Sequence, residues 1–225
     1  MAIAPVHHLL PAAGTVPPPD EACEALARSL RAETRGEVLF DAASRGRYAT
    51  DASIHQIMPV GVFVPTCDED IAIALQAAAR LKVPVLPRGA GTSQCGQAVG
   101  AALVIDNTRH FRKLLSLDVE AGVAEVEPGL VLDHLNAALK PHGLWFPVDV
   151  STSAQATQGG MAGNNSCGSR SIAYGNMVHN VLGASAWMAD GELLRFGPVA
   201  QASGRTARIA AFVRELATRH RDEIH

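Results

Sequence analysis

The chain has 225 residues, of which 48% are hydrophobic and 18% are charged, so it is long enough and apolar enough to bury a substantial core. Its formal net charge of -3 and its lack of a long Lys/Arg cluster exclude nucleic-acid binding as its main role. No run approaches the roughly 18–20 apolar residues that span a bilayer, and Pro5 and Pro11 interrupt the N-terminus before a signal-like segment forms. We therefore expect a soluble cytoplasmic protein without a transmembrane segment.

The four cysteines are spread along the chain without a CxxC pair, at Cys23, Cys67, Cys95 and Cys167. Zinc ribbons and iron–sulfur clusters need closely spaced thiolates, so neither is encoded here. We expect reduced, buried thiols and no bound metal.

Residues 1–19 are rich in proline and alanine and are expected to form a poorly ordered lead-in. Apolar residues at helical spacing predict a helix over 21–34 with Asp20 as its cap, and Gly36 separates it from a short strand over 38–40. A second short helix is expected from Asp41. Residues 48–55 have no strong period and indicate a loop that leads toward the functional site.

From residue 60 the pattern predicts a β–α–β unit, with strands over 60–65 and 83–87 and a helix from Asp68 between them. Ile71 and Leu75 fall on one face of that helix, which indicates packing on a sheet. The acidic residues Asp68, Glu69 and Asp70 are expected to form a solvated first turn favoured by the helix dipole, rather than a metal site.

The second strand of this unit leads into a glycine-rich loop that reads PRGAGTS over residues 87–93. Glycine reaches backbone angles that other residues avoid, so successive N–H groups around Gly89 and Gly91 can form a concave anion site. Thr92 and Ser93 add hydroxyl donors, and Arg88 offers a compensating charge. The loop is either a phosphate site or an ordinary surface turn.

Two common phosphate motifs do not match this loop. A dinucleotide fingerprint needs GxGxxG at the start of a helix, whereas the loop runs on into an apolar, strand-like stretch from Ala102 to Asp106. Gly91 and Gly96 have the spacing of a Walker motif, but Gln97 and Ala98 occupy the positions of its Lys and its Ser or Thr. A P-loop NTPase is therefore excluded.

Further along, the sequence predicts paired strands over 111–118 and 122–128, a helix over 131–143, a hairpin over 181–197 that turns at Asp190–Gly191, and a last helix from about Arg205. This helix stops in charged residues at the end of the chain, so we expect a piece of a longer protein.

Between the helix over 131–143 and the hairpin, residues 151–175 hold five glycines and many Ser, Thr and Asn residues. Two separated small-residue regions indicate a long ligand between two lobes, for which a dinucleotide is the natural candidate.

Three segments carry a resemblance to a known family, namely PRGAGTS at 87–93, VDVSTSAQATQGGMAGNNSCG at 148–168 and YGNMVHNVLG at 174–183. They resemble the PCMH-type FAD-binding domain of the vanillyl-alcohol-oxidase-type flavoproteins, and within it the D-lactate, glycolate and D-2-hydroxyglutarate dehydrogenases. The resemblance implies a two-lobed α+β fold with FAD between the lobes. A small parallel α/β lobe would span 20–110, and a lobe with an antiparallel sheet and helices would span 111–225, with the substrate cap domain absent.

The glycine loop contains no histidine that could link to the flavin, so the resemblance implies non-covalent FAD. Cys95 and Cys167 are the only other candidates for a covalent linkage. Pro147, Gln158 and the order His179-Asn180 depart from the family pattern. The implied cofactor-binding residues are Arg88, Gly89, Ala90, Gly91, Thr92, Ser93, Gly96, Ser151, Thr152, Ala156, Thr157, Gly159, Gly160, Asn164, Ser166, Gly168, Gly175 and Val181.

The function implied by the resemblance is an FAD-dependent oxidoreductase that oxidises a small D-2-hydroxy acid bound through the absent cap domain. The flavin would carry the redox chemistry while the protein holds and tunes it. The sequence assigns neither a catalytic residue nor the electron acceptor. Two alternatives stay open: an NADPH-dependent flavin reductase of the same superfamily, and a module that binds FAD or another nucleotide without chemistry.

Overall fold

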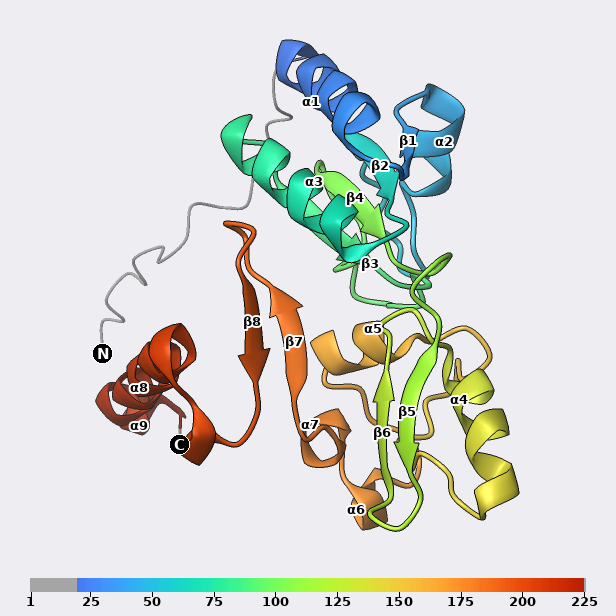
Figure 1. Ribbon diagram of the computed structural model, residues 1–225, viewed down its shortest axis with the longest axis vertical. Helices are drawn as coiled ribbons and strands as arrows, with labels where there is room; N and C mark the ends of the chain where they lie inside the picture. Colours follow the sequence, from blue (N-terminus) through green and yellow to red (C-terminus); the bar gives the residue numbers. More distant parts are fainter. Residues whose placement is uncertain (1–19, 225) are drawn as a thin grey trace, which may run out of the picture.

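The structure is a computed structural model, and it describes residues 20–224. The predicted lead-in over residues 1–19 lies outside the described residues. The described part of the chain contains one mixed sheet and two separate hairpins, each associated with helices (Figure 1). Helices and strands of both orientations place the fold in the α+β class.

The first sheet has four strands in the order β1-β2-β4-β3. β2, β4 and β3 run parallel, with Val62 opposite Val104 and Leu86 opposite Val104 on its other side. β1 pairs antiparallel with β2 at the edge, so the prediction of a parallel sheet is corrected at this strand. The strands are β1 (Glu37–Leu39), β2 (Gly61–Val64), β3 (Val85–Arg88) and β4 (Leu103–Asp106).

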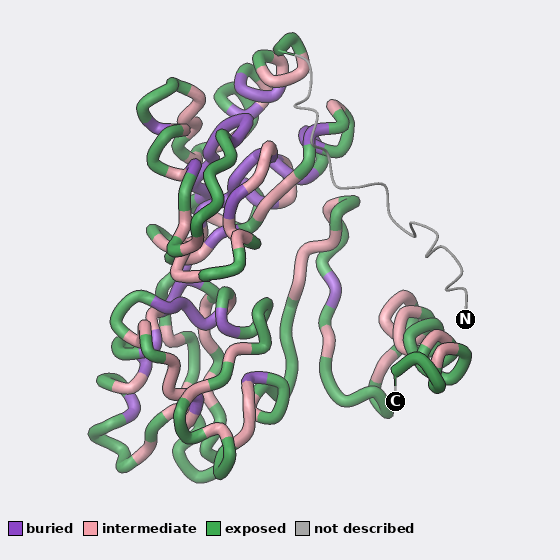
Figure 2. The backbone as a smooth tube through the Cα atoms, turned by 180° about the vertical axis from the view of Figure 1, so that it is seen from behind, coloured by how far each residue is buried: buried purple, intermediate pink, exposed green. Residues whose placement is uncertain are grey.

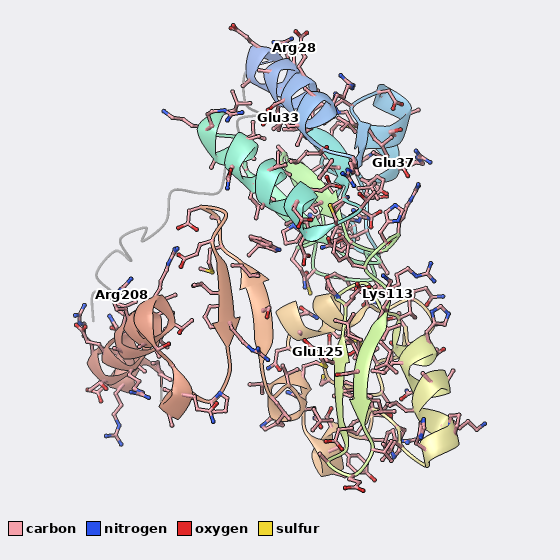
Figure 3. All side chains as sticks on the ribbon, viewed as in Figure 1. Arg28, Glu33, Glu37, Lys113, Glu125 and Arg208 are labelled. Carbon is pink, nitrogen blue, oxygen red and sulfur yellow. The ribbon has the colours of Figure 1, made fainter. Side chains whose placement is uncertain are left out.

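Two amphipathic helices cover the same face of this sheet, α1 (Asp20–Glu33) and α3 (Asp68–Arg80). Their apolar faces pack with Phe63, Leu103 and Ile105 into one core, because alternate strand residues point to one side of a sheet. Charged side chains on the outer face of α1 point to solvent (Figure 3). The short α2 (Ala42–Arg47) begins where the sequence predicts, since the Asp41 carboxylate accepts a hydrogen bond from Ser44 N at 2.9 Å.

One acidic residue in the first turn of α3 is buried, contrary to the prediction of a solvated turn. Asp68 and Glu69 are exposed, but Asp70 is only 2% exposed. Its carboxylate accepts hydrogen bonds from Arg35 N at 2.9 Å and from Thr66 N and Oγ1 at 2.8 and 2.7 Å. Burial raises the pKa of Asp70, but these hydrogen bonds outweigh it and leave the pKa lowered. Asp70 therefore fastens the start of α3 to the segment after α1.

The second half of the chain contains the two predicted hairpins. The glycines in their turns, Gly122 and Gly191, have φ of +63° and +82°. Helix α4 packs its leucines against the first hairpin, and Gly143 ends the following 3-10 turn in the left-handed conformation, as predicted. The elements are β5 (Leu114–Asp118), β6 (Val123–Val126), α4 (Leu132–Leu139), η1 (Lys140–His142), β7 (Ala184–Trp187) and β8 (Leu193–Phe196).

The small-residue region over 151–175 and the residues directly after it contain three short helices. Met161 and Met177 from two of them are buried with Leu132, Val148 and Ala156 in a small core. The helices are α5 (Gln158–Gly163), α6 (Ser171–Tyr174) and α7 (Met177–Asn180).

The last elements stand apart from both cores. The η2 turn (Val199–Gln201) is followed by α8 (Gly204–Arg219) and α9 (Arg221–Ile224), and α8 contains no buried residue. Figure 2 shows the β7–β8 hairpin and these helices almost entirely as exposed or half-buried chain. Within residues 20–224, no helix is both long and apolar enough to cross a bilayer.

Candidate cofactor site

The glycine loop begins at the carboxyl end of β3 and returns to the start of β4, its parallel neighbour, without an intervening helix. Gly91 and Gly96 adopt φ of +70° and +78°, which only glycine reaches readily. The backbone N–H groups of Gly89 to Ser93 donate no hydrogen bond to any of the residues described. Five successive donors without a partner among the described residues, at the carboxyl edge of a parallel sheet, are available to an anion such as pyrophosphate.

Arg88 has a structural role that the sequence does not suggest. Arg88 is 9% exposed, and its guanidinium lies beside Gly91, where a Cβ atom would come within 2.5 Å of Nη2. The guanidinium donates to three backbone carbonyl oxygens, Tyr48 O at 3.0 Å, Thr50 O at 2.7 Å and Ala98 O at 2.9 Å. Three of the five N–H donors of the guanidinium are engaged by these carbonyls, so Arg88 holds the two ends of the loop to the preceding segment.

The segment before β2 lies along the glycine loop. The sequence analysis expects residues 48–55 to form a loop that leads toward the site, and this position agrees with it. Besides the two bonds from Arg88, Ala52 N donates to Gly91 O at 3.0 Å. The Asp51 carboxylate, close to Arg88, accepts from Ser53 N at 2.8 Å. Burial raises the pKa of Asp51, whereas this hydrogen bonding and the charge of Arg88 outweigh burial and leave the pKa lowered.

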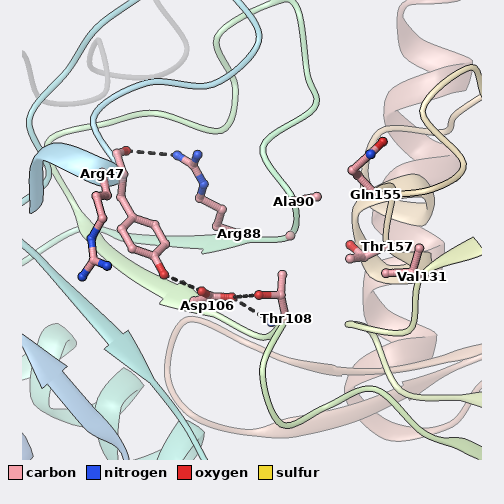
Figure 4. A pocket seen from close by; sticks show the side chains of 10 residues that line it. Arg47, Arg88, Ala90, Asp106, Thr108, Val131, Gln155 and Thr157 are labelled. Atoms are coloured by element: carbon pink, nitrogen blue, oxygen red, sulfur yellow. Dashed lines mark hydrogen bonds between the residues drawn. The ribbon is translucent and has the colours of Figure 1, made fainter. Parts of the chain in front are cut away.

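A cavity of about 360 Å³ opens beside the loop, between the end of the first sheet and the chain around Val131 and Thr157 (Figure 4). Its floor is a polar network in which Tyr48 Oη donates to Asp106 Oδ2 at 2.6 Å and Thr108 N and Oγ1 each donate to Asp106 Oδ1 at 2.7 Å. Burial, together with the hydrogen bond to Asp106 and the charge of that residue, raises the pKa of Tyr48 to about 12. The phenol is therefore a fixed donor at neutral pH. Sequence reasoning did not identify Tyr48 or Asp106, because only the fold brings them together.

The structure brings the two small-residue regions into contact, which supports their use as one site. A Cβ atom placed on Gly89 would lie 2.3 Å from Thr157 Oγ1, so the loop backbone reaches Thr157 only because Gly89 lacks a side chain. At the other end of the loop, Gln97 Nε2 donates to Asn164 Oδ1 at 2.7 Å. Thr157 and Asn164 flank α5 as its N-cap and C-cap residues.

Several predicted residues of the second region have structural roles in this fold. Ala156 is buried in the core beside Leu132. A side chain at position 159 would collide with Pro128, and the Gly159 N–H donates to Pro128 O at 2.8 Å. Gly160 N donates to Thr157 Oγ1 at 3.4 Å. Gln158, a departure from the family pattern, is buried with an Nε2 that has no partner among the described residues.

The remaining predicted residues divide into two groups. The backbone N–H groups of Ser151 and Thr152 donate to none of the described residues, and both residues lie just before α5. Ser166, Gly168, Gly175 and Val181 lie farther along, around α6 and α7, and α6 is at the end of the molecule away from the glycine loop. Gly168 makes room for Asp149, and Gly175, at φ +77°, makes room for His179.

Two side chains near these loops, Arg170 and His179, are engaged in holding local structure. Arg170 pairs with Asp149 at 3.4 Å and stacks over Trp145 at 5.1 Å from the ring centroid. His179 Nδ1 accepts from Asn176 N at 3.0 Å in the capping box of α7. Neither presents a free group to the glycine loop in the part of the chain described.

The cysteine prediction is partly wrong. Cys95 and Cys167 are exposed and Cys23 and Cys67 are half-buried, although none of the four forms a disulfide. Within residues 20–224, no three His, Cys, Asp or Glu side chains gather into a possible metal site.

Comparison with known proteins identifies the family to which the chain belongs. Residues 59–197 match the family model described as "FAD binding domain". The chain belongs to this family. The matched range contains the glycine loop, Thr157 and Asn164, so the free donors of the loop and the bond between the two regions lie inside the FAD-binding unit. FAD is its cofactor.

Individual relatives show how much of a longer protein this chain represents. A D-2-hydroxyglutarate dehydrogenase from Pseudomonas putida is 36% identical over 193 residues, which cover 81% of this chain and 19% of that protein. The glycolate oxidase subunit GlcD from Bacillus subtilis is 32% identical over 73% of this chain and 36% of its own length. The chain thus spans about a fifth to a third of these relatives. Among solved structures, wild-type Physcomitrella patens BBE-like 1 has the same fold, with 20% identity and a TM-score of 0.67 over 79% of this chain and 38% of that one.

Proposed function

We propose that the chain is the FAD-binding part of a flavoprotein oxidoreductase that oxidises a D-2-hydroxy acid. FAD binding is supported by the run of N–H groups from Gly89 to Ser93 that have no partner among the described residues, in a loop where Gly91 adopts φ +70°. The substrate class is supported by relatives named D-2-hydroxyglutarate dehydrogenase and glycolate oxidase subunit. We further propose non-covalent FAD and a division into two lobes near residue 110, between the end of β4 and the start of β5.

The described residues supply binding and orientation. The loop N–H groups would hold the pyrophosphate, the Thr92 and Ser93 hydroxyls would add donors, and Ser151 and Thr152 would contribute from the second region. When bound, the flavin supplies the acceptor for a hydride from the substrate carbon. Oxidation of a hydroxy acid also needs a cation for the carboxylate and a base near the hydroxyl. Arg170 and His179 are engaged elsewhere, so we assign both of these roles to residues outside the chain.

Binding is tested by titrating FAD with the purified chain and following flavin fluorescence. We expect saturable binding, and acid or heat should release the flavin into the supernatant. Colour that stays with the precipitate would refute non-covalent binding, and absence of saturation would refute the cofactor assignment.

The substrate class is tested with a chimaera in which this chain replaces the matching residues of the Pseudomonas putida relative. Under anaerobic conditions, D-2-hydroxyglutarate or D-lactate should bleach the flavin of the chimaera but not that of the chain alone. Bleaching by NADPH instead would favour the reductase alternative. A chimaera that holds FAD but is bleached by none of these would favour a module without chemistry.

A further inference from the structure

The segment that lies along the glycine loop forms a closed arm, residues 49–57. Thr50 pairs with Gln56 in an antiparallel bridge, and Ile57 N donates to Ala49 O at 2.9 Å, which closes the arm at its base. At its tip, Ser53 N donates to Asp51 Oδ1 at 2.8 Å and His55 N donates to Ser53 Oγ at 3.0 Å. These local bonds fix the direction in which the tip residues point.

The arm is fastened to both ends of the glycine loop. Ala52 N bonds Gly91 O near the start of the loop, and Arg88 joins Thr50 O to Ala98 O near its end. The arm and the loop are therefore joined by backbone hydrogen bonds and by a buried guanidinium.

His55 at the tip of the arm rests directly on the glycine loop. A Cβ atom placed on Gly96 would lie 2.5 Å from His55 Cδ2, so the imidazole occupies the space that a side chain at position 96 would fill. Gly96 has φ +78°, which also favours glycine there. The side chain is exposed, and its ring nitrogens have no hydrogen-bond partner among the described residues.

We propose that His55 is a cofactor-binding residue that donates a ring N–H to a pyrophosphate oxygen of FAD. The inference rests on the proposed FAD site and extends it to a side chain outside the glycine motif. The loop provides backbone donors from Gly89 to Ser93, and the arm adds one side-chain donor over the same loop at Gly96. Imidazole carries an N–H in both its neutral and its charged form, so the contact is available across the physiological pH range.

The test measures the affinities of the full 225-residue chain for FAD and for ADP-ribose, which shares the adenosine pyrophosphate of FAD but lacks the flavin. His55→Leu removes the donor, His55→Gln keeps an N–H, and His142→Leu is the control, because His142 is also exposed but lies in η1. We expect His55→Leu to weaken both ligands by about tenfold or more, the size of one hydrogen bond to a charged acceptor. His55→Gln should lose less, and His142→Leu should match the wild-type chain.

Three results would overturn the assignment. Equal affinities of wild type and His55→Leu would show that the imidazole does not contact the cofactor. A loss confined to FAD, with ADP-ribose unchanged, would place His55 at the flavin instead of the pyrophosphate. An equal loss in His142→Leu would attribute the effect to general instability. Failure of the wild-type chain to bind either ligand would instead refute the proposed function itself, so the two failures are distinguishable.

Discussion

Replacing Arg88 by methionine should destabilise the protein more than any substitution on the ligand side of the loop. The side chain is 9% exposed and makes three hydrogen bonds of 2.7–3.0 Å to carbonyl oxygens. Methionine fills a similar volume but donates nothing, so these carbonyls lose their partner. At about 1–1.5 kcal/mol for each contact, the free energy of unfolding should fall by about 3–5 kcal/mol. Because the arm and the loop separate, FAD affinity should fall as well.

The assay is urea unfolding followed by circular dichroism, with Arg112→Met as the control. Arg112 is exposed, and no hydrogen bond or ion pair to another described residue involves it, so its replacement should change stability by less than about 0.5 kcal/mol. A decrease below about 1 kcal/mol in Arg88→Met would show that water replaces the guanidinium, and it would refute the role of Arg88 as the support of the loop.

Three further predictions follow from single residues. Gly91→Val should abolish FAD binding while leaving most secondary structure intact, because its Cβ would lie 2.5 Å from Arg88 Nη2 at φ +70°; undiminished binding in a fluorescence titration would contradict this. Asp70→Asn should lower stability by about 1–3 kcal/mol at pH 7. The folded pKa of Asp70 is lowered, so its contribution to the free energy of unfolding is complete above the ordinary value of about 3.9 and is lost as the pH falls through the folded value. The stability of Asp70→Asn, measured by urea unfolding, should therefore fall less steeply with acid than that of the wild-type chain. Tyr48→Phe should remove a phenol that ionises near pH 12 in an ultraviolet titration, and loss of a phenol that ionises near the ordinary value of about 10 would contradict the bond to Asp106.

The elements that the sequence predicts well are those whose signal is local. The strands on either side of the glycine loop, the helix from Asp68 and both hairpins follow from apolar periodicity and from turn glycines such as Gly122 and Gly191. The short helices α5, α6 and α7 were missed because a helix of four to six residues has little stability of its own and depends on packing. Met161 and Met177 provide that packing through contacts with distant residues.

The backbone of the glycine loop was predictable from the sequence, but the contacts of the side chains around it were not. Glycine spacing predicts the loop that the structure places between β3 and β4, whereas the direction of Arg88 depends on carbonyls about 40 residues earlier in the chain. The burial of Asp70 likewise depends on Arg35, whose approach is set by the packing of α1 on α3. His55 carries no motif, and only the contact with Gly96 distinguishes it from any other exposed histidine.

The fastening of the loop by Arg88 also has a kinetic consequence. A loop whose shape is already fixed has little conformational entropy left to lose when a ligand arrives. Association should then be a single step whose observed rate rises linearly with ligand concentration, without the plateau that a slow rearrangement imposes. The free donors of Gly89 to Ser93 would thus be preorganised at encounter, and differences in affinity among variants of the arm should appear mainly in the dissociation rate.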